Sequence, residues 1–287
     1  TMIFLPSFFG HDYRVVYSQV EQVKYVSEIK HPVVKAVLEN SDIKEGIEIH
    51  HDGDLPAHSG LGSSSSFSVG MLHCMHALKG RIVSKRELAD ESIHLERNIL
   101  NEYGGHQDQI AVSHGGFNKI IFIKDGSYRI EPVTVNMEKI KQLQNHFMLI
   151  FTGLSRYSFK IAEDQDSNVP DCGSQLSQLQ SMVCEAVKIL NRNDDDIQEF
   201  GKLLHESWKL KRSLSKKISS QEINNIYDTA MNAGALGGKL IGAGGGGFML
   251  LFVPPEKRRK VRDALDGLLE VDFKFENDGS QVIYYTR

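Results

Sequence analysis

The stretch Asp54-Leu-Pro-Ala-His-Ser-Gly-Leu-Gly-Ser-Ser-Ser-Ser-Phe67 decides the fold, because it joins two segments of different periodicity. Residues 46–51 before it alternate as in a strand, and residues 68–78 after it follow a helical pattern. Gly60 and Gly62 let the backbone turn and let a ligand approach the main chain. The serines at 63–66 fall at the helix start, where free N–H groups and a partial positive charge hold anions. We interpret residues 56–66, the serine loop, as a cradle for nucleotide phosphates. A helix simply capped by serine is the alternative.

Neither of the two common phosphate-binding fingerprints explains this loop. A P-loop requires Gly-x4-Gly-Lys-Ser/Thr, and no lysine follows Gly62. A dinucleotide fingerprint occurs formally in Gly242-Ala-Gly-Gly-Gly-Gly247, but a helix must follow it. The apolar run at 248–253 predicts a buried strand there instead. We therefore do not interpret this glycine run (residues 242–247) as a dinucleotide site.

Composition limits the class of protein. The chain has 287 residues and a formal net charge of −4, which argues against a general nucleic-acid or membrane-surface binder. The three cysteines lack metal spacing, and Cys74 and Cys184 are expected to be buried thiols, which fits a reducing cytoplasm. No segment approaches the ~20 apolar residues of a membrane helix, and no basic region precedes the first apolar residues, so we expect no signal peptide.

Strands and helices mix irregularly along the chain, which favours an α+β fold. We expect two lobes, residues 1–140 and 141–287, with a cleft between them. Asp125-Gly126 predicts a hairpin, and Ser84 with Glu87 predicts a capping box for a helix that runs to about residue 100. Further elements are expected as strands at 13–18, 146–152, 271–275 and 281–286, and as helices at 31–39, 175–192, 195–214, 219–233 and 255–269.

Two carboxylates are candidates for the chemistry. Asp108 follows a glycine turn near a helix start, where it stays ionised and could orient or deprotonate an attacking hydroxyl. It could equally stabilise only its own helix. Glu96, with a serine hydroxyl best supplied by Ser64, could hold Mg²⁺ beside the phosphates, although a surface glutamate paired with a basic residue is the alternative.

Basic side chains in the second half could form another anionic subsite. The candidates are Arg156, Lys209, Lys211 and Arg212, whose alternative role is a solvated face, and Trp208 beside them could be core. His73 and His76 lie three apart but lack a third ligand, so they do not predict a metal site.

Three stretches together resemble the GHMP kinase superfamily, which includes galactokinase, homoserine kinase and mevalonate kinase. The serine loop resembles its second motif, residues 239–248 resemble its third, and Gly105-His-Gln-Asp108 resembles the segment with the catalytic aspartate. The resemblance implies two lobes, a ribosomal-protein-S5-domain-2-like N-terminal lobe that binds ATP and a ferredoxin-like C-terminal lobe. It implies Asp108 as the catalytic residue and Ser64 with Glu96 as Mg²⁺ ligands. It assigns nucleotide contacts to Pro56, Ser59, Gly60, Leu61, Gly62, Ser63, Ser64, Ser65, Gly244, Gly245 and Gly246.

Within the superfamily, the chain is most similar to kinases of D-glycero-D-manno-heptose 7-phosphate, on segments that include 105–111, 152–156 and 206–211. This similarity implies ATP-dependent phosphorylation of the anomeric hydroxyl to give the 1,7-bisphosphate. It implies substrate contacts from Gly105, His106, Arg156, Lys209 and Lys211, and small-molecule partners, with a homodimer left open. A kinase of a free sugar such as L-fucose and a non-catalytic nucleotide-binding relic are the alternatives.

One family motif has no counterpart. The family begins with a strand and a sugar-binding motif of the type Pro-x-Arg-apolar-Gly-Gly-Gly-Thr-Asp, and nothing in the chain matches it. His58 also stands where the family prefers a small residue.

Overall fold

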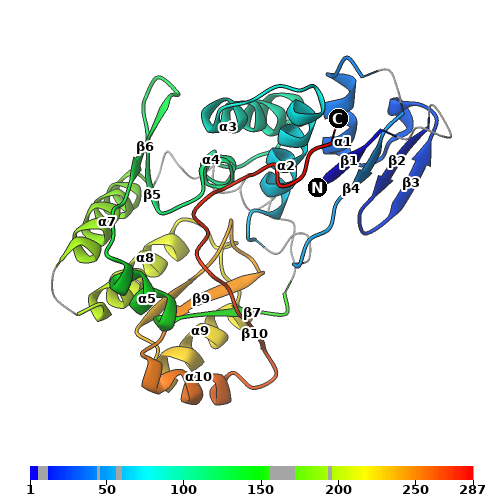
Figure 1. Cartoon of the computed structure of the whole chain (residues 1–287). Helices are drawn as coiled ribbons and strands as arrows, with labels where there is room; N and C mark the ends of the chain where they lie inside the picture. The colour runs from blue at the N-terminus through cyan, green and yellow to red at the C-terminus, as the bar shows by residue number, and fades with distance from the viewer. Residues whose placement is uncertain (6–11, 44–45, 56–59, 155–171, 193–195, 287) are drawn as a thin grey trace. The chain divides into compact units, whose positions relative to one another are not determined.

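The computed structural model describes residues 1–5, 12–43, 46–55, 60–154, 172–192 and 196–286 (Figure 1). Pro56, His58, Ser59 and Arg156 lie outside these residues. The chain divides into two units, the first made of Thr1–Ala57, Gly62–Gly116 and Glu276–Arg287, and the second of His58–Leu61 and Phe117–Phe275. These units do not coincide with the expected lobes 1–140 and 141–287, so those lobes stay a prediction about the family's domains.

The first unit contains a four-stranded sheet of order β1-β4-β2-β3. The strands are β1 (Met2–Phe4), β2 (Tyr13–Val16), β3 (Val20–Val23) and β4 (Glu48–His50). β2 pairs with β4 in parallel, and the other pairs are antiparallel. The core places Val15 and Ile49 of the sheet against Val34 of α1 (Pro32–Glu39) and Met71 of α2 (Ser63–Leu78), because these apolar side chains share one buried cluster.

Further helical segments of the first unit position the candidate site. α3 (Lys85–His94) begins with the predicted capping box of Ser84 and Glu87, which the structure confirms. The expected helix does not continue regularly to residue 100, because η2 (Leu95–Ile99) is a π-helical turn. α4 (Gln107–His114) follows, and a short 3₁₀ turn, η1 (Val26–Glu28), precedes α1.

The second unit contains a four-stranded antiparallel sheet of order β10-β7-β9-β8. Its strands are β7 (Phe147–Phe151), β8 (Gly237–Leu240), β9 (Phe248–Phe252) and β10 (Leu269–Val271). Met148, Met249 and Leu251 pack with α9 (Gln221–Ala233) and α10 (Arg258–Ala264), whereas Phe147 and Phe252 belong to a separate cluster with Leu143 of α5 (Met137–His146). Both faces of this sheet are therefore buried, as the continuous apolar run of β9 predicts.

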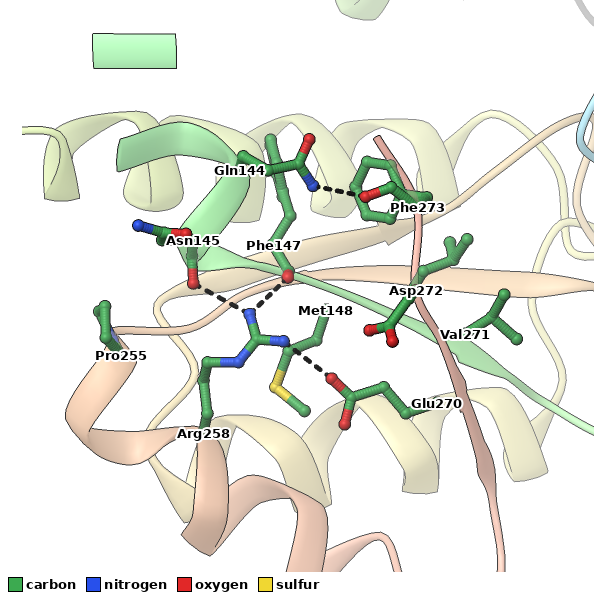
Figure 2. A pocket seen from close by; sticks show the side chains of 11 residues that line it. Gln144, Asn145, Phe147, Met148, Pro255, Arg258, Glu270, Val271, Asp272 and Phe273 are labelled. Atoms are coloured by element: carbon green, nitrogen blue, oxygen red, sulfur yellow. Dashed lines mark hydrogen bonds and ion pairs between the residues drawn. The ribbon is translucent and has the colours of Figure 1, made fainter. Parts of the chain in front are cut away.

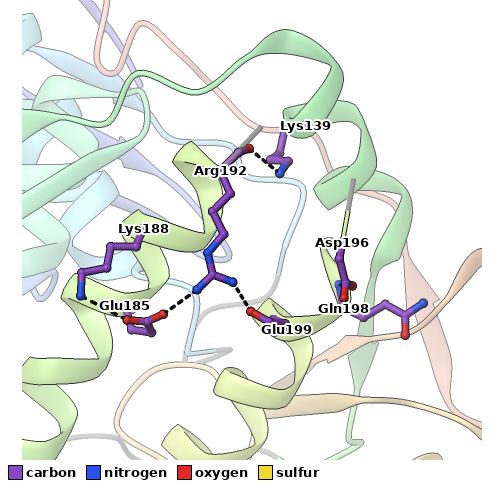
Figure 3. Close-up of polar contacts among 7 residues, drawn as sticks. All are labelled: Lys139, Glu185, Lys188, Arg192, Asp196, Gln198 and Glu199. Carbon is purple, nitrogen blue, oxygen red and sulfur yellow. Dashed lines mark hydrogen bonds and ion pairs between the residues drawn. The ribbon is translucent and has the colours of Figure 1, made fainter. Parts of the chain in front are cut away.

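Polar contacts tie the remaining elements of this unit together. β5 (Asn118–Phe122) and β6 (Tyr128–Pro132) form the predicted hairpin. Figure 3 shows Arg192 at the end of α7 (Gly173–Asn191) between Glu185 and Glu199, the latter on α8 (Gln198–Ser213), while Lys139 of α5 donates to the Arg192 carbonyl at 3.0 Å.

Three expectations are wrong. The helix expected to reach residue 269 comprises η4 (Pro255–Lys257) and α10 and ends at Ala264. Residues 281–286 form no strand. The strand expected at 271–275 is observed as β10, at residues 269–271. Cys184 is exposed on α7, whereas Cys172 is buried and Cys74 is partly buried. In the part of the chain that the structure describes, no helix has both the length and the apolar character to span a membrane.

Candidate active site

The serine loop enters α2 without a side-chain cap. Gly62 is the N-cap residue, has a left-handed φ of +71°, and as a glycine provides no side chain to cap the first turn. Gly60 also has a positive φ, +80°, so both glycines adopt a conformation that other residues rarely reach. The alternative of a serine-capped helix is therefore not what forms. The N-cap residue therefore does not occupy the first-turn N–H groups of Ser63, Ser64 and Ser65, which is the kind of position where a helix start binds an anion.

Asp108 lies directly against this helix start. A methyl group placed on Gly62 would lie 3.4 Å from Cγ and Oδ2 of Asp108. Asp108 is in the first turn of α4, so its carboxylate also faces the positive end of that helix. The sequence-predicted base and the sequence-predicted phosphate cradle are therefore neighbours within the first unit.

Glu96 lies in the π-helical turn and is 5% exposed. Its Oε2 accepts a hydrogen bond from Ser65 Oγ at 3.1 Å and another from Gln109 Nε2. The hydroxyl that contacts Glu96 thus comes from Ser65, whereas Ser64 is exposed. Burial raises the pKa of Glu96, opposed by the nearby polar groups of Ser68, Gln109 and Ser65, and the charge of Asp108 raises it further. An uncompensated carboxylate at this place would be costly.

The residues around Glu96 fit a hard divalent cation. Glu96 Oε1 is buried and has no hydrogen-bond partner among the described residues, although its Oε2 has two. No group of three or more His, Cys, Asp and Glu side chains able to hold a metal occurs within the described ranges. Mg²⁺ is bound in this way in nucleotide sites, by one or two protein oxygens with phosphate and water supplying the rest.

The glycine run of the second unit is held by its backbone. Gly245 N donates to Ile218 O at 2.8 Å, and Gly247 N donates to Leu154 O at 2.7 Å. A methyl group on Gly244 would lie 2.8 Å from Ile218 O, and one on Gly246 would lie 2.5 Å from Leu154 O. These positions need glycine because neighbouring carbonyls occupy the space of a side chain, and the strand that follows is β9, as expected.

The serine loop and the glycine run touch without side chains between them. A methyl group on Gly242 would lie 2.6 Å from Gly60 O, and one on Gly60 would lie 3.0 Å from Ile241 O. Lys211 Nζ donates to Gly242 O at 2.5 Å and to Leu240 O at 3.5 Å. Lys211 therefore holds the start of the glycine run in place through backbone carbonyls.

The other basic candidates have structural partners as well. Lys209 is exposed and forms an ion pair with Glu206 at 3.0 Å. Arg212 donates to Asn224 and lies over the ring of Trp208, which is fully buried, so the interpretation of Trp208 as core is confirmed.

Gly105 and His106 belong to the turn before α4. A methyl group on Gly105 would meet nothing within 4 Å, so this backbone is open to a ligand. His106 is the N-cap residue of α4, and burial lowers its pKa, with a further lowering from Arg97. His106 is therefore neutral near pH 7. His73 and His76 are bound to Ser280 and Glu91, respectively.

Gln109 is the site residue to which the sequence interpretation gave no role. It follows Asp108 directly, and its amide reaches Glu96 because α4 packs against the π-helical turn. A polar residue at a helix position that is otherwise apolar, next to Ile110, was the available signal.

Two hollows among the described residues lie away from the candidate site. One of about 310 Å³ in the second unit contains Arg258, which donates to the carbonyls of Asn145 and Phe147 and pairs with Glu270 (Figure 2). The other, about 440 Å³ in the first unit, lies among α1, α2 and α3. Neither is lined by the serine loop, Asp108 or the glycine run.

Comparison with known proteins shows the family of the chain. Residues 24–116 match the model of the GHMP kinases N terminal domain, and residues 186–270 match that of the GHMP kinases C terminal. The chain is 31% identical over 235 residues to D-glycero-alpha-D-manno-heptose 7-phosphate kinase of Campylobacter jejuni, covering 80% of this chain and 69% of the relative. It is 24% identical to mevalonate kinase of Pyrococcus horikoshii, covering 88% of this chain and 70% of the relative.

A solved structure has the same fold. It is a D-glycero-D-manno-heptose 1-phosphate kinase from Bacteroides thetaiotaomicron, with a TM-score of 0.74 at 22% identity over 97% of this chain and 84% of that one. This structure confirms the α+β prediction, and the two domain models with the 31% identical relative confirm the predicted superfamily. Because both GHMP kinase domain models match the chain and a relative is 31% identical to it, the chain belongs to the GHMP kinase family.

Proposed function

We propose that this chain is an ATP-dependent kinase that phosphorylates the anomeric hydroxyl of a sugar phosphate. D-glycero-D-manno-heptose 7-phosphate, converted to the 1,7-bisphosphate, is the proposed substrate. The observation that carries the proposal is the position of the Asp108 carboxylate. A methyl group placed on Gly62, at a helix start that lacks a side-chain N-cap, would lie 3.4 Å from Asp108 Oδ2. The similarity to the Campylobacter jejuni kinase supports the choice of sugar.

Asp108 orients the sugar hydroxyl and accepts its proton. The hydroxyl oxygen then forms a bond to the γ-phosphorus of ATP, while the bond from that phosphorus to the β,γ-bridging oxygen breaks and ADP leaves. The N–H groups of Ser63, Ser64 and Ser65 hold the phosphates, and the glycine run, including Gly244, Gly245 and Gly246, supports that loop. Most of the rate enhancement comes from positioning and charge stabilisation.

Ser64 and Glu96 would hold Mg²⁺. The cation would neutralise charge on the β- and γ-phosphates when bound. Glu96 Oε1, which has no hydrogen-bond partner among the described residues, would supply one ligand, and the exposed hydroxyl of Ser64, next to the Glu96-bound Ser65, would supply another. Ser65 then acts on Glu96 rather than on the cation.

On the substrate side we propose Gly105, His106, Arg156, Lys209 and Lys211. His106 is neutral and can donate or accept a hydrogen bond to a sugar hydroxyl. Lys209 pairs with Glu206 and Lys211 donates to Gly242 O. Either lysine would therefore have to bind the phosphate of the sugar in addition to its protein partner. This observation favours a second candidate, the phosphorylation of a free sugar such as L-fucose.

We also propose that the protein works in the cytoplasm on small molecules. Cys74, Cys172 and Cys184 are all free thiols, which fits a reducing compartment. The weak net charge of −4 supports small-molecule partners over nucleic acid or a membrane surface.

The substitution Asp108→Asn tests the proposed reaction. ADP release is measured with heptose 7-phosphate and separately with L-fucose, and binding of a non-hydrolysable ATP analogue is measured in parallel. We expect turnover to fall at least about 100-fold, with analogue binding retained. Asp266→Asn, on an exposed carboxylate, is the matched control. Wild-type turnover in Asp108→Asn would refute the role of Asp108, and turnover with L-fucose alone would replace the proposed substrate.

A further inference from the structure

A buried polar layer lies where α2, α3 with η2, and α4 meet. Each helix contributes two polar residues spaced three or four apart, so each pair shares one helix face. All are at most 5% exposed, and they are Ser65 and Ser68, Ser92 and Glu96, and Gln109 and Ser113. A helix interface in a small domain ordinarily buries apolar residues, so this layer needs a reason.

Two hydrogen bonds of this layer converge on one oxygen, and Ser68 also lies near the same carboxylate. Ser65 Oγ and Gln109 Nε2 both donate to Glu96 Oε2. Glu96 Oε1 has no partner among the described residues, although it is buried. A carboxylate that rotated to expose Oε2 would lose both donors, so this arrangement determines which oxygen is offered to a ligand.

Gln109 can face Glu96 only with its nitrogen. An amide oxygen turned toward the carboxylate would be repelled by it, whereas the N–H group forms a charge-assisted hydrogen bond. Gln109 is adjacent to Asp108 in α4. One turn of this helix therefore supplies both the base and a donor to the carboxylate.

We propose that Gln109 is a positioning residue that orients Glu96, so that Oε1 faces the divalent cation of the bound nucleotide. This inference rests on the proposed function, because it assumes that Glu96 binds the cation. Gln109 touches neither the cation nor the substrate in this role. Its effect is transmitted through the hydrogen bond to Oε2, and Ser65 acts on the same oxygen from α2.

The test measures nucleotide binding without any sugar. The affinity for a non-hydrolysable ATP analogue is determined by calorimetry with and without Mg²⁺, and the ratio gives the metal-dependent tightening. In Gln109→Met, which keeps the side-chain volume, we expect about a 10–100-fold loss of this tightening. Metal-free affinity is expected to stay near wild type, whereas a merely structural role for Gln109 would weaken the metal-free and metal-bound affinities alike.

Two variants complete the design. Gln107→Met lies on the exposed side of the same helix and should keep the wild-type tightening. Ser65→Ala removes the second donor to Oε2 and should also lose tightening, which supplies a test if Gln109→Met does not fold. Wild-type tightening in either Gln109→Met or Ser65→Ala would overturn the proposal.

Glu96→Gln separates this inference from the proposed reaction. If Glu96→Gln keeps full tightening, the cation does not bind there and the positioning role of Gln109 is refuted. If Glu96→Gln and Gln109→Met both lose tightening while the wild type phosphorylates neither sugar, the positioning role is supported and only the proposed substrate fails.

Discussion

Gly242→Ala should weaken nucleotide binding through backbone contact alone. Gly242 has a φ of +74°, and its added methyl would lie 2.6 Å from Gly60 O and 2.9 Å from Gly60 Cα. Opening the first contact from 2.6 to 3.0 Å requires a shift of about 0.4 Å between two backbones. Lys211 holds the Gly242 carbonyl, so the glycine run cannot simply withdraw.

The magnitude follows from the backbone conformation. A left-handed φ costs an alanine about 1–2 kcal/mol, which disfavours the binding-competent loop by about 5–30-fold before the steric overlap is counted. We expect the dissociation constant of an ATP analogue to rise at least about 10-fold, measured by calorimetry. Gly173→Ala makes the same chemical change at the start of α7, where a methyl meets nothing within 4 Å, and should leave binding unchanged. Wild-type affinity in Gly242→Ala would refute the reasoning.

Three further predictions concern groups with defined partners. Glu96→Gln should match or exceed the wild-type free energy of unfolding in urea at neutral pH without Mg²⁺. Because burial raises the pKa of Glu96, the stability of the wild type falls as pH rises through the folded pKa. The difference in stability between the two proteins should therefore disappear at a pH below the ordinary glutamate pKa. Lys211→Met should weaken ATP-analogue binding about 10-fold or more, since the lost charge-assisted bonds to the glycine run contribute about 1.5–3 kcal/mol, and unchanged calorimetric affinity would count against this support. Arg258→Ala should lower the free energy of unfolding by about 3 kcal/mol, because the carbonyls of Asn145 and Phe147 and the carboxylate of Glu270 lose their partner. In the same urea titration Arg259→Ala should cost under about 0.5 kcal/mol, because the Arg259 side chain is 91% exposed.

Local signals predicted most of the elements. The capping box at Ser84, the hairpin around Asp125-Gly126 and the helix after the serine loop all formed as expected, because each depends on residues close in sequence. Strand β8 had no such signal. Its Gly237 is there because a methyl would lie 2.0 Å from Gly201 O, a restriction set by the packing of α8 on the strand.

The opposite error arose at residues 281–286. Their alternating pattern resembles a strand, yet Ile283 is 92% exposed and Tyr284 is 79% exposed. A strand needs a partner edge as well as a pattern, and no described strand pairs with this segment.

The site was predictable in its motifs but not in its contacts. The serine loop, Asp108 and Glu96 were identified from sequence, and the structure brings Asp108 to Gly62 and Glu96 to Ser65. The choice of Ser65 over Ser64 depends on which serine faces inward, which the π-helical turn and helix packing determine. The distribution of hydrogen bonds over the two Glu96 oxygens is likewise a tertiary property, so the role proposed for Gln109 could not be read from the sequence.

The return of residues 276–280 to the first unit has a consequence for biosynthesis. Gly116 N donates to Glu276 O, Ser280 N donates to Val112 O, and Lys85 Nζ donates to Asp278 O, each at 2.9 Å. When Gly116 has just emerged from the ribosome, the nascent chain lacks these partners. Gly115, on which a methyl group would lie 2.0 Å from Gly279 N, then has no chain to pack against. The unit that carries Asp108 therefore finishes folding only after the 117–275 segment has been translated, and ribosome-stalled intermediates ending before residue 276 should leave α4 protease-sensitive.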